Sequence, residues 1–151
     1  RIVVVPPATP TQTLTPSPTL TPTPTATVTP TPLISAAGTV TLQNGQALDL
    51  DTGSLDSGEA DDVAYQVGVE GYHVLTPKSG TIMGVFGLVE PNPESCQAAG
   101  MSEAPLALES LTAGTYLCYQ TDQALYGWLR YTSLEIVRQS VSLDFHTWTS
   151  P

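Results

Sequence analysis

Six acidic residues lie close together in this sequence, and carboxylates are the side chains that calcium sites and acid–base catalysis both use. They are Asp49, Asp51, Asp56, Glu59, Asp61 and Asp62. An EF-hand calcium loop counted from Asp49 needs Gly at its sixth position and Glu at its twelfth. This chain has Ser54 and Ala60 there. We therefore interpret the segment as a solvated acidic hairpin and assign no metal ligand, with an irregular calcium site on a β-loop as the alternative.

Other catalytic patterns are weak. The two histidines, His73 and His146, are too few and too far apart in the sequence to indicate a metal centre, and we expect each to lie on a strand. The Gly-x-Ser-x-Gly motif of a serine nucleophile is absent. Pairs of acids for glycoside hydrolysis could be drawn in many ways, so no pair is informative. We predict that the protein is not an enzyme and has neither catalytic residues nor a cofactor.

Several aromatic residues could stack on sugar rings. These are Tyr126, Trp128, Tyr131 and Trp148. They fall on predicted strands, where packing in a core is the more common role of an aromatic side chain. We favour core packing and keep a sugar-binding surface as the alternative.

The two cysteines, Cys96 and Cys118, are 22 residues apart. The closely spaced ligand pairs of a zinc cluster and the Cys-x-x-Cys of a redox site are both absent. An even pair in a secreted chain predicts a disulfide, and loop entropy gives it about 3.4 kcal/mol of stabilisation. Two separate buried thiols are the alternative.

From residue 36 onward, short alternating or β-branched runs are separated by Gly, Pro, Asn, Asp and Ser. This pattern predicts an all-β, β-sandwich-like domain over residues 36–151. Asn44-Gly45 predicts a type I′ hairpin turn, and Gly84 and Gly87 predict a bulge or a close backbone approach. The expected strands cover residues 39–43, 46–50, 63–69, 72–75, 81–89, 106–111, 115–121, 127–132 and 141–148.

Two resemblances concern this domain. Residues 113–118, Ala-Gly-Thr-Tyr-Leu-Cys, resemble strand F of immunoglobulin domains, but the cysteine spacing departs from that family and supports only a packed Tyr116. Residues 48–53, 114–122 and 143–148 resemble an uncharacterised β-rich module at the C-terminal end of bacterial surface and membrane-anchored proteins, typically after Thr/Pro linkers. This resemblance covers about residues 38–149. It implies an extracellular binding or structural module without known catalytic residues.

Before the domain, residues 6–35 form a predicted stalk. Residues 6–32 contain 9 Pro, 11 Thr and 1 Ser, a composition typical of extended polyproline-type and O-glycosylated segments. At about 3.1 Å per residue such a rod could reach roughly 80 Å. No Asn-x-Ser/Thr sequon occurs, so we expect O-linked glycans. The candidate sites are Thr9, Thr11, Thr13, Thr15, Ser17, Thr19, Thr21, Thr23, Thr25, Thr27, Thr29 and Thr31.

The charge distribution and hydropathy exclude some partners. The formal net charge is −10, and no charged residue occurs between Ile2 and Leu48. An acidic surface disfavours nucleic acid and anionic membranes. No apolar run is long enough for a membrane span. The chain starts at Arg1, which we interpret as the result of processing. We expect an extracellular or cell-surface location in a bacterium.

Two functional hypotheses follow. The residues Ile2, Val3, Val4 and Val5 are β-branched and lie beyond a long tether, as expected for a strand donated to a neighbouring copy. Head-to-tail donation generates a fibre, so the first hypothesis is a homopolymeric subunit of an extracellular filament or surface assembly. The alternative is a monomeric carbohydrate- or peptide-binding module on a spacer. In that case the same four residues are the stub of a removed anchor.

Overall fold

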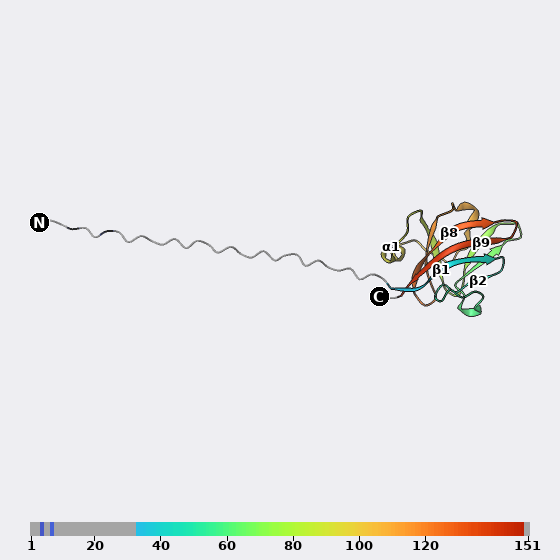
Figure 1. The fold of residues 1–151 in the computed structure, drawn as a ribbon, viewed down its shortest axis with the longest axis horizontal. Helices are drawn as coiled ribbons and strands as arrows, with labels where there is room; N and C mark the ends of the chain where they lie inside the picture. Colours follow the sequence, from blue (N-terminus) through green and yellow to red (C-terminus); the bar gives the residue numbers. More distant parts are fainter. Residues whose placement is uncertain (1–3, 5–6, 8–32, 150–151) are drawn as a thin grey trace. The chain divides into compact units, whose positions relative to one another are not determined.

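The computed structural model describes Val4, Pro7 and residues 33–149 of the chain (Figure 1). Residue 6 and residues 8–32 of the predicted stalk, which include all twelve candidate glycosylation residues, lie outside the described residues, as do the donor-strand residues Ile2, Val3 and Val5. Val4 is 84% exposed. The contacts divide the chain into Arg1–Pro30 and Thr31–Pro151, and the second unit contains the folded domain.

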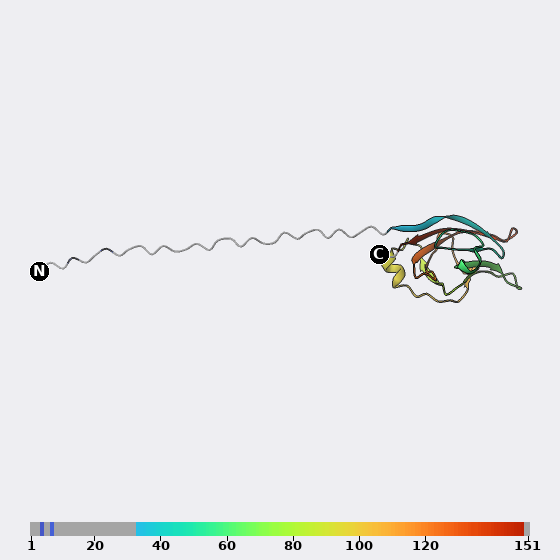
Figure 2. The same cartoon turned by 90° about the horizontal axis from the view of Figure 1, so that it is seen from below.

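The domain contains two antiparallel sheets (Figures 1 and 2). The larger sheet has the spatial order β1 (Ile34–Gln43), β9 (Ser140–Trp148), β8 (Tyr126–Glu135), β7 (Tyr116–Gln120) and β5 (Ile82–Gly87). The smaller sheet has the order β2 (Ala47–Leu48), β3 (Val63–Val67), β4 (His73–Pro77) and β6 (Leu106–Ala107). The prediction of a strand-rich domain is confirmed. Strand β1 begins two residues before the predicted domain start, because Ile34 pairs with Trp148 beyond a bulge.

One hydrophobic core takes side chains from both sheets. Strands β8 and β9 alternate between buried and partly exposed positions, so one face of each strand lies in this core. The buried members of the core are Leu42, Leu48, Leu50, Val63, Tyr65, Leu75, Met83, Leu108, Leu117, Tyr119, Leu129, Tyr131, Val141, Leu143 and Phe145.

The predicted type I′ hairpin at Asn44-Gly45 is wrong. Gly45 has a φ of +88°, but Asn44 is not among the residues with positive φ. A type I′ turn needs positive φ at both central residues, whereas a type II turn needs it only at the second. The Gln46 N–H donates to the carbonyl of Gln43 across this turn. The turn leads from β1 in the larger sheet to β2 in the smaller one, so the two strands do not pair.

The prediction for Gly84 and Gly87 is confirmed. The register of β5 on β7 shifts between Val85 and Gly87, as a bulge requires. A Cβ atom at Gly84 would lie 2.1 Å from the carbonyl oxygen of Gly100. The backbone of the following loop therefore lies directly against β5.

Three short helical segments interrupt the strands. The helix α1 (Pro93–Gln97) begins at a capping box formed by Asn92 and Ser95. Two single 3₁₀ turns lie in other connections: η1 (Gly58–Ala60) between β2 and β3, and η2 (Leu108–Ser110) between β6 and β7. Among residues 33–149, no helix has the length and apolar character needed to cross a membrane.

Candidate functional site

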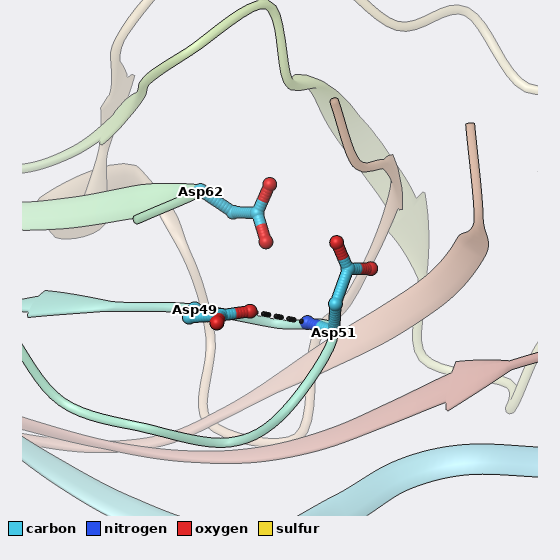
Figure 3. Close-up of side chains that lie close together, drawn as sticks. All are labelled: Asp49, Asp51 and Asp62. Atoms are coloured by element: carbon cyan, nitrogen blue, oxygen red, sulfur yellow. Dashed lines mark hydrogen bonds between the residues drawn. The ribbon is translucent and has the colours of Figure 1, made fainter. Parts of the chain in front are cut away.

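Three aspartates come together where the smaller sheet begins. Asp49 and Asp51 follow β2 directly, and Asp62 immediately precedes β3. Oxygen atoms of the three carboxylates all lie within 4.8 Å of one another. Figure 3 shows the three side chains facing a common space, with the Asp51 N–H donating to Asp49 over 2.9 Å. All three residues are buried.

Asp49 is fixed by its own loop. One carboxylate oxygen accepts hydrogen bonds from the N–H groups of Asp51 and Thr52, and the other accepts from the Thr52 hydroxyl at 2.7 Å. The Gly53 N–H donates to the Asp49 carbonyl. Aspartate favours such turns because its short side chain reaches the backbone two residues ahead. The Asp49 carboxylate is therefore held in one orientation by local sequence alone.

Asp62 is fixed by residues that are distant in the sequence. One oxygen accepts from the Leu50 N–H at 2.8 Å, and the other accepts from the Thr81 hydroxyl at 2.6 Å. The Asp122 N–H lies 3.4 Å from the second oxygen. Burial raises the pKa of Asp62, and these three hydrogen bonds lower it.

Asp51 has no such support. Neither of its carboxylate oxygens has a hydrogen-bond partner among the described residues, although the residue is only 8% exposed. The pKa of Asp51 is raised to about 6, chiefly by burial and to a lesser extent by the carboxylates of Asp62, Asp49 and Asp122. The Thr121 side chain lowers this pKa, but it makes no hydrogen bond of ordinary geometry with either carboxylate oxygen. A buried polar group without a partner is costly, so this carboxylate requires an explanation.

A buried hydrogen-bond chain holds the backbone between the aspartates. The Thr147 hydroxyl donates to the Leu50 carbonyl, so its oxygen accepts from the Tyr119 hydroxyl at 2.6 Å. Burial raises the pKa of Tyr119, which keeps this phenol protonated as a donor. Through this chain β7 and β9 of the larger sheet position the loop that contains Asp49 and Asp51.

The prediction of a solvated acidic hairpin is wrong for four of its six residues. Asp49, Asp51, Asp61 and Asp62 are buried, with exposed fractions between 0 and 8%. Asp61 accepts from the N–H groups of Ser57 and Gly58 instead of joining the cluster. Asp56 and Glu59 are exposed as expected. Acidic spacing alone could not separate these roles, because the groups that bond to Asp62 and to the Leu50 carbonyl, at Thr81, Asp122 and Thr147, are distant in the sequence.

The disulfide between Cys96 and Cys118 is present, as predicted, with Cα atoms 5.2 Å apart. It joins α1 to β7 on the face of the larger sheet opposite the main core. Both cysteines are fully buried in a second cluster with Trp148, and Trp128 packs against this cluster. The disulfide therefore stabilises a loop that covers the outer face of the sheet.

Both histidines lie on strands, as predicted, His73 on β4 and His146 on β9. Their rings contact aromatic residues: His73 stacks on Tyr65, and His146 stacks on Trp128 at a centroid distance of 5.4 Å. Of the candidate sugar-stacking residues, Tyr131 and Trp148 are 7% exposed. Core packing explains these two, and Trp128 and Tyr126 are partly exposed at the disulfide cluster.

A second surface feature was not anticipated from the sequence. Strand β5 is an edge of the larger sheet, and Val85, Phe86, Leu88 and Val89 in and after it are 38 to 75% exposed. This segment, residues 85–89, is called the open edge below. The expected strand 81–89 already contained these residues, but their exposure depends on which strand lies at the edge.

We compared the chain with known proteins. No protein-family model, no curated protein and no solved structure matches it.

Proposed function

We propose that this protein is a non-enzymatic structural subunit of an extracellular filament or surface assembly, in which residues 2–5 of one copy add as a β-strand to the open edge of another copy. The two sheets with their shared core form a β-sandwich in this proposal, and residues 6–32 form its O-glycosylated stalk. The disulfide and the absence of a membrane-spanning helix among residues 33–149 are compatible with an extracellular location.

The observation that carries the proposal is the unpaired backbone of the open edge. Met83 exchanges both of its backbone hydrogen bonds with Ser102 on the side of β5 away from β7. Because hydrogen-bonding direction alternates along an antiparallel strand, Val85 presents its N–H and C=O to that same side. No described residue pairs with Val85 there. An unpaired edge of this kind is a template for an added strand.

The side chains of the open edge suit an apolar donor. Val85 is 52% exposed, Leu88 66% and Val89 75%. An added strand of four β-branched or apolar residues would cover these groups, and burial of apolar area stabilises a complex by about 25 cal/mol per Å². The donor has apolar side chains on both of its faces, which suits a position covered on both sides.

The other sheet edges fit this donor less well. On β1, the outward side chains include Thr39 and Thr41, whose hydroxyls bond to Asp144 and Ser142 on the neighbouring strand. The edge strands β2 and β6 of the smaller sheet have only two residues each. The open edge after Met83 is thus the best acceptor among the described strands.

The proposed stalk is long enough for residues 2–5 of one copy to contact a neighbouring copy. A globular domain of about 117 residues has a radius of gyration of roughly 13 Å. A polyproline-type rod of residues 6–32 could span about 80 Å. A tether of that length exceeds what pairing within one chain requires, and it suits a neighbouring copy.

The test compares assembly of four proteins by sedimentation velocity and negative-stain electron microscopy. These are the full chain, a deletion of residues 1–5, a Val85→Lys variant that charges the open edge, and a Val137→Lys control. Val137 is 96% exposed and lies between β8 and β9, away from β5. We expect the full chain and the control to assemble and the other two to remain folded monomers, because an edge lysine blocks strand addition.

A full chain that is monomeric at high concentration, or a deletion variant that still assembles, would contradict the proposal. A monomeric full chain would leave a binding module on a spacer as the function, whereas a deletion variant that assembles would leave a subunit that polymerises through another contact.

A further inference from the structure

The aspartate cluster has the spacing of a cation site. Two ligands that each lie 2.3–2.6 Å from one calcium ion can be at most about 5 Å apart. The carboxylate oxygens of Asp49, Asp51 and Asp62 lie within 4.8 Å of one another and so fall inside this limit. A single ion could contact all three residues.

The cluster has no cationic partner in the described part of the chain. The ion pairs there join Lys78 to Asp61 and Arg130 to Asp144, and neither cation reaches the cluster. The charge of Asp122 adds to the repulsion at Asp51 and Asp62. Burial of several carboxylates together is unfavourable unless a cation or a proton compensates them.

Asp51 distinguishes this cluster from a purely structural one. Asp49 and Asp62 use their oxygens to hold the loop, as described above. Asp51 is buried and faces the other two carboxylates, yet both of its oxygens lack hydrogen-bond partners (Figure 3). A turn or a loop brace does not need a carboxylate at this position, whereas a metal ligand does.

We propose that Asp49, Asp51 and Asp62 bind one calcium ion. All three offer hard oxygen ligands, which calcium and magnesium prefer. The set lacks the histidine and cysteine side chains that zinc and copper prefer, so these two metals fit it less well. Calcium accepts irregular arrangements and completes its shell with water or backbone carbonyls, whereas magnesium demands near-ideal octahedral geometry. An irregular loop with three carboxylates, two of which are held by hydrogen bonds, suits calcium better.

The ion would lock the segment 49–62, which connects β2 to β3 within the smaller sheet. Asp49 and Asp51 lie at the start of this segment, and Asp62 lies at its end. Leu50 donates its N–H to Asp62, and its carbonyl accepts from the Thr147 hydroxyl on β9. Binding of calcium to the native fold alone would therefore stabilise the domain by mass action. Calcium sites of extracellular modules bind with dissociation constants of about 10⁻⁴ to 10⁻³ M.

The experiment uses the full chain after removal of metal with a chelator. Isothermal titration with calcium chloride should show one ion per chain with a Kd on the order of 10⁻⁴ to 10⁻³ M. The Tm should rise by at least about 4 °C in 10 mM calcium. The same concentration of magnesium should raise it clearly less.

Two variants locate the ion. Asp51→Asn keeps the shape of the side chain, and it should weaken calcium binding at least about tenfold and abolish the calcium-dependent rise in Tm. Glu59→Gln removes one charge from an exposed acid of the same segment, and it should bind calcium like the unaltered protein.

Three outcomes would overturn the proposal. If calcium changes neither the heat signal nor the Tm of the full chain, the cluster shares protons instead of a metal. If Asp51→Asn binds as tightly as the unaltered chain, the ion lies elsewhere. Equal stabilisation by magnesium would reject the choice of calcium.

Discussion

Asp51 and Asp56 belong to the same acidic segment, but their environments are opposite. Asp56 is exposed and accepts hydrogen bonds from Ala47 and Gln46, whereas Asp51 is buried without a partner. The sequence shows the acids and their spacing. It does not show which of them the residues around Thr81 and Thr121 cover, because those residues are distant in the chain. The acidic cluster could therefore be noticed from the sequence, but the sequence could not show which of its carboxylates lacks hydrogen-bond partners.

The imidazole of His146 should make stability depend on pH. Burial lowers the pKa of His146, against a raising effect of Glu90. The folded state thus binds this proton less tightly than the unfolded state, whose histidine titrates near 6.5. The contribution of His146 to the free energy of unfolding is complete above about pH 6.5 and falls as the pH drops below it.

Urea unfolding of the unaltered protein and of His146→Phe at pH 5, 6 and 7 measures this contribution to the free energy of unfolding. Phe retains a ring between Trp128 and Trp148, both of which contact the imidazole. We expect the difference in stability between the two proteins to move in favour of the variant as the pH falls. A difference that does not change with pH would contradict this account.

Gly84 should not tolerate a side chain. A Cβ atom there would lie 2.1 Å from the Gly100 carbonyl oxygen, while a Cβ atom at Gly100 would meet nothing within 4 Å. We expect Gly84→Ala to lower the free energy of unfolding by about 1–3 kcal/mol or more and Gly100→Ala to change it by less than about 0.5 kcal/mol. Chemical denaturation of both variants tests this, and equal effects would contradict the close approach.

At the scale of elements, most strands could be predicted because alternation and turn residues are local signals. The strands β3 (Val63–Val67) and β9 (Ser140–Trp148) agree with the strands predicted over residues 63–69 and 141–148 to within about two positions. The pairing of β1 could not be predicted. Asn44-Gly45 indicates a turn, but its type and the sheet that the next strand joins depend on contacts with β9 and β3. The helix α1 has five residues, which is too short for helical periodicity to show.

The disulfide should contribute most of the stabilisation that the entropy of its closed loop allows. It closes a loop between residues 22 apart in sequence and fastens α1 to β7. Loop entropy predicts a loss of about 3.4 kcal/mol when the bond is reduced. We expect a Cys96→Ser, Cys118→Ser double variant to unfold at correspondingly lower urea concentration. Unchanged stability would mean that the packing around Trp128 and Trp148 is sufficient by itself.

For the whole molecule, composition separates a Thr/Pro-rich segment, residues 6–32, from a folded domain, and of that segment the structure describes only Pro7. If the segment is an O-glycosylated stalk, the intact mass of the protein from its natural source will exceed the 15.9 kDa of the bare chain by several hexoses. Peptide mapping should place the excess on the twelve Thr and Ser residues named above. An unmodified mass would leave a plain linker, without the stiffening that sugars give an extended rod.

The central claim is that residues 2–5 of one copy contact the open edge of another, and cross-linking between two chains tests it directly. A Val4→Cys chain is mixed with a mass-tagged chain that has Cys in place of Val85, Phe86 or Leu88, and the mixture is oxidised. The account predicts a disulfide-linked heterodimer with at least one of these three chains and none with a Val137→Cys chain. No heterodimer with any open-edge chain, or equal linkage to Val137→Cys, would contradict it.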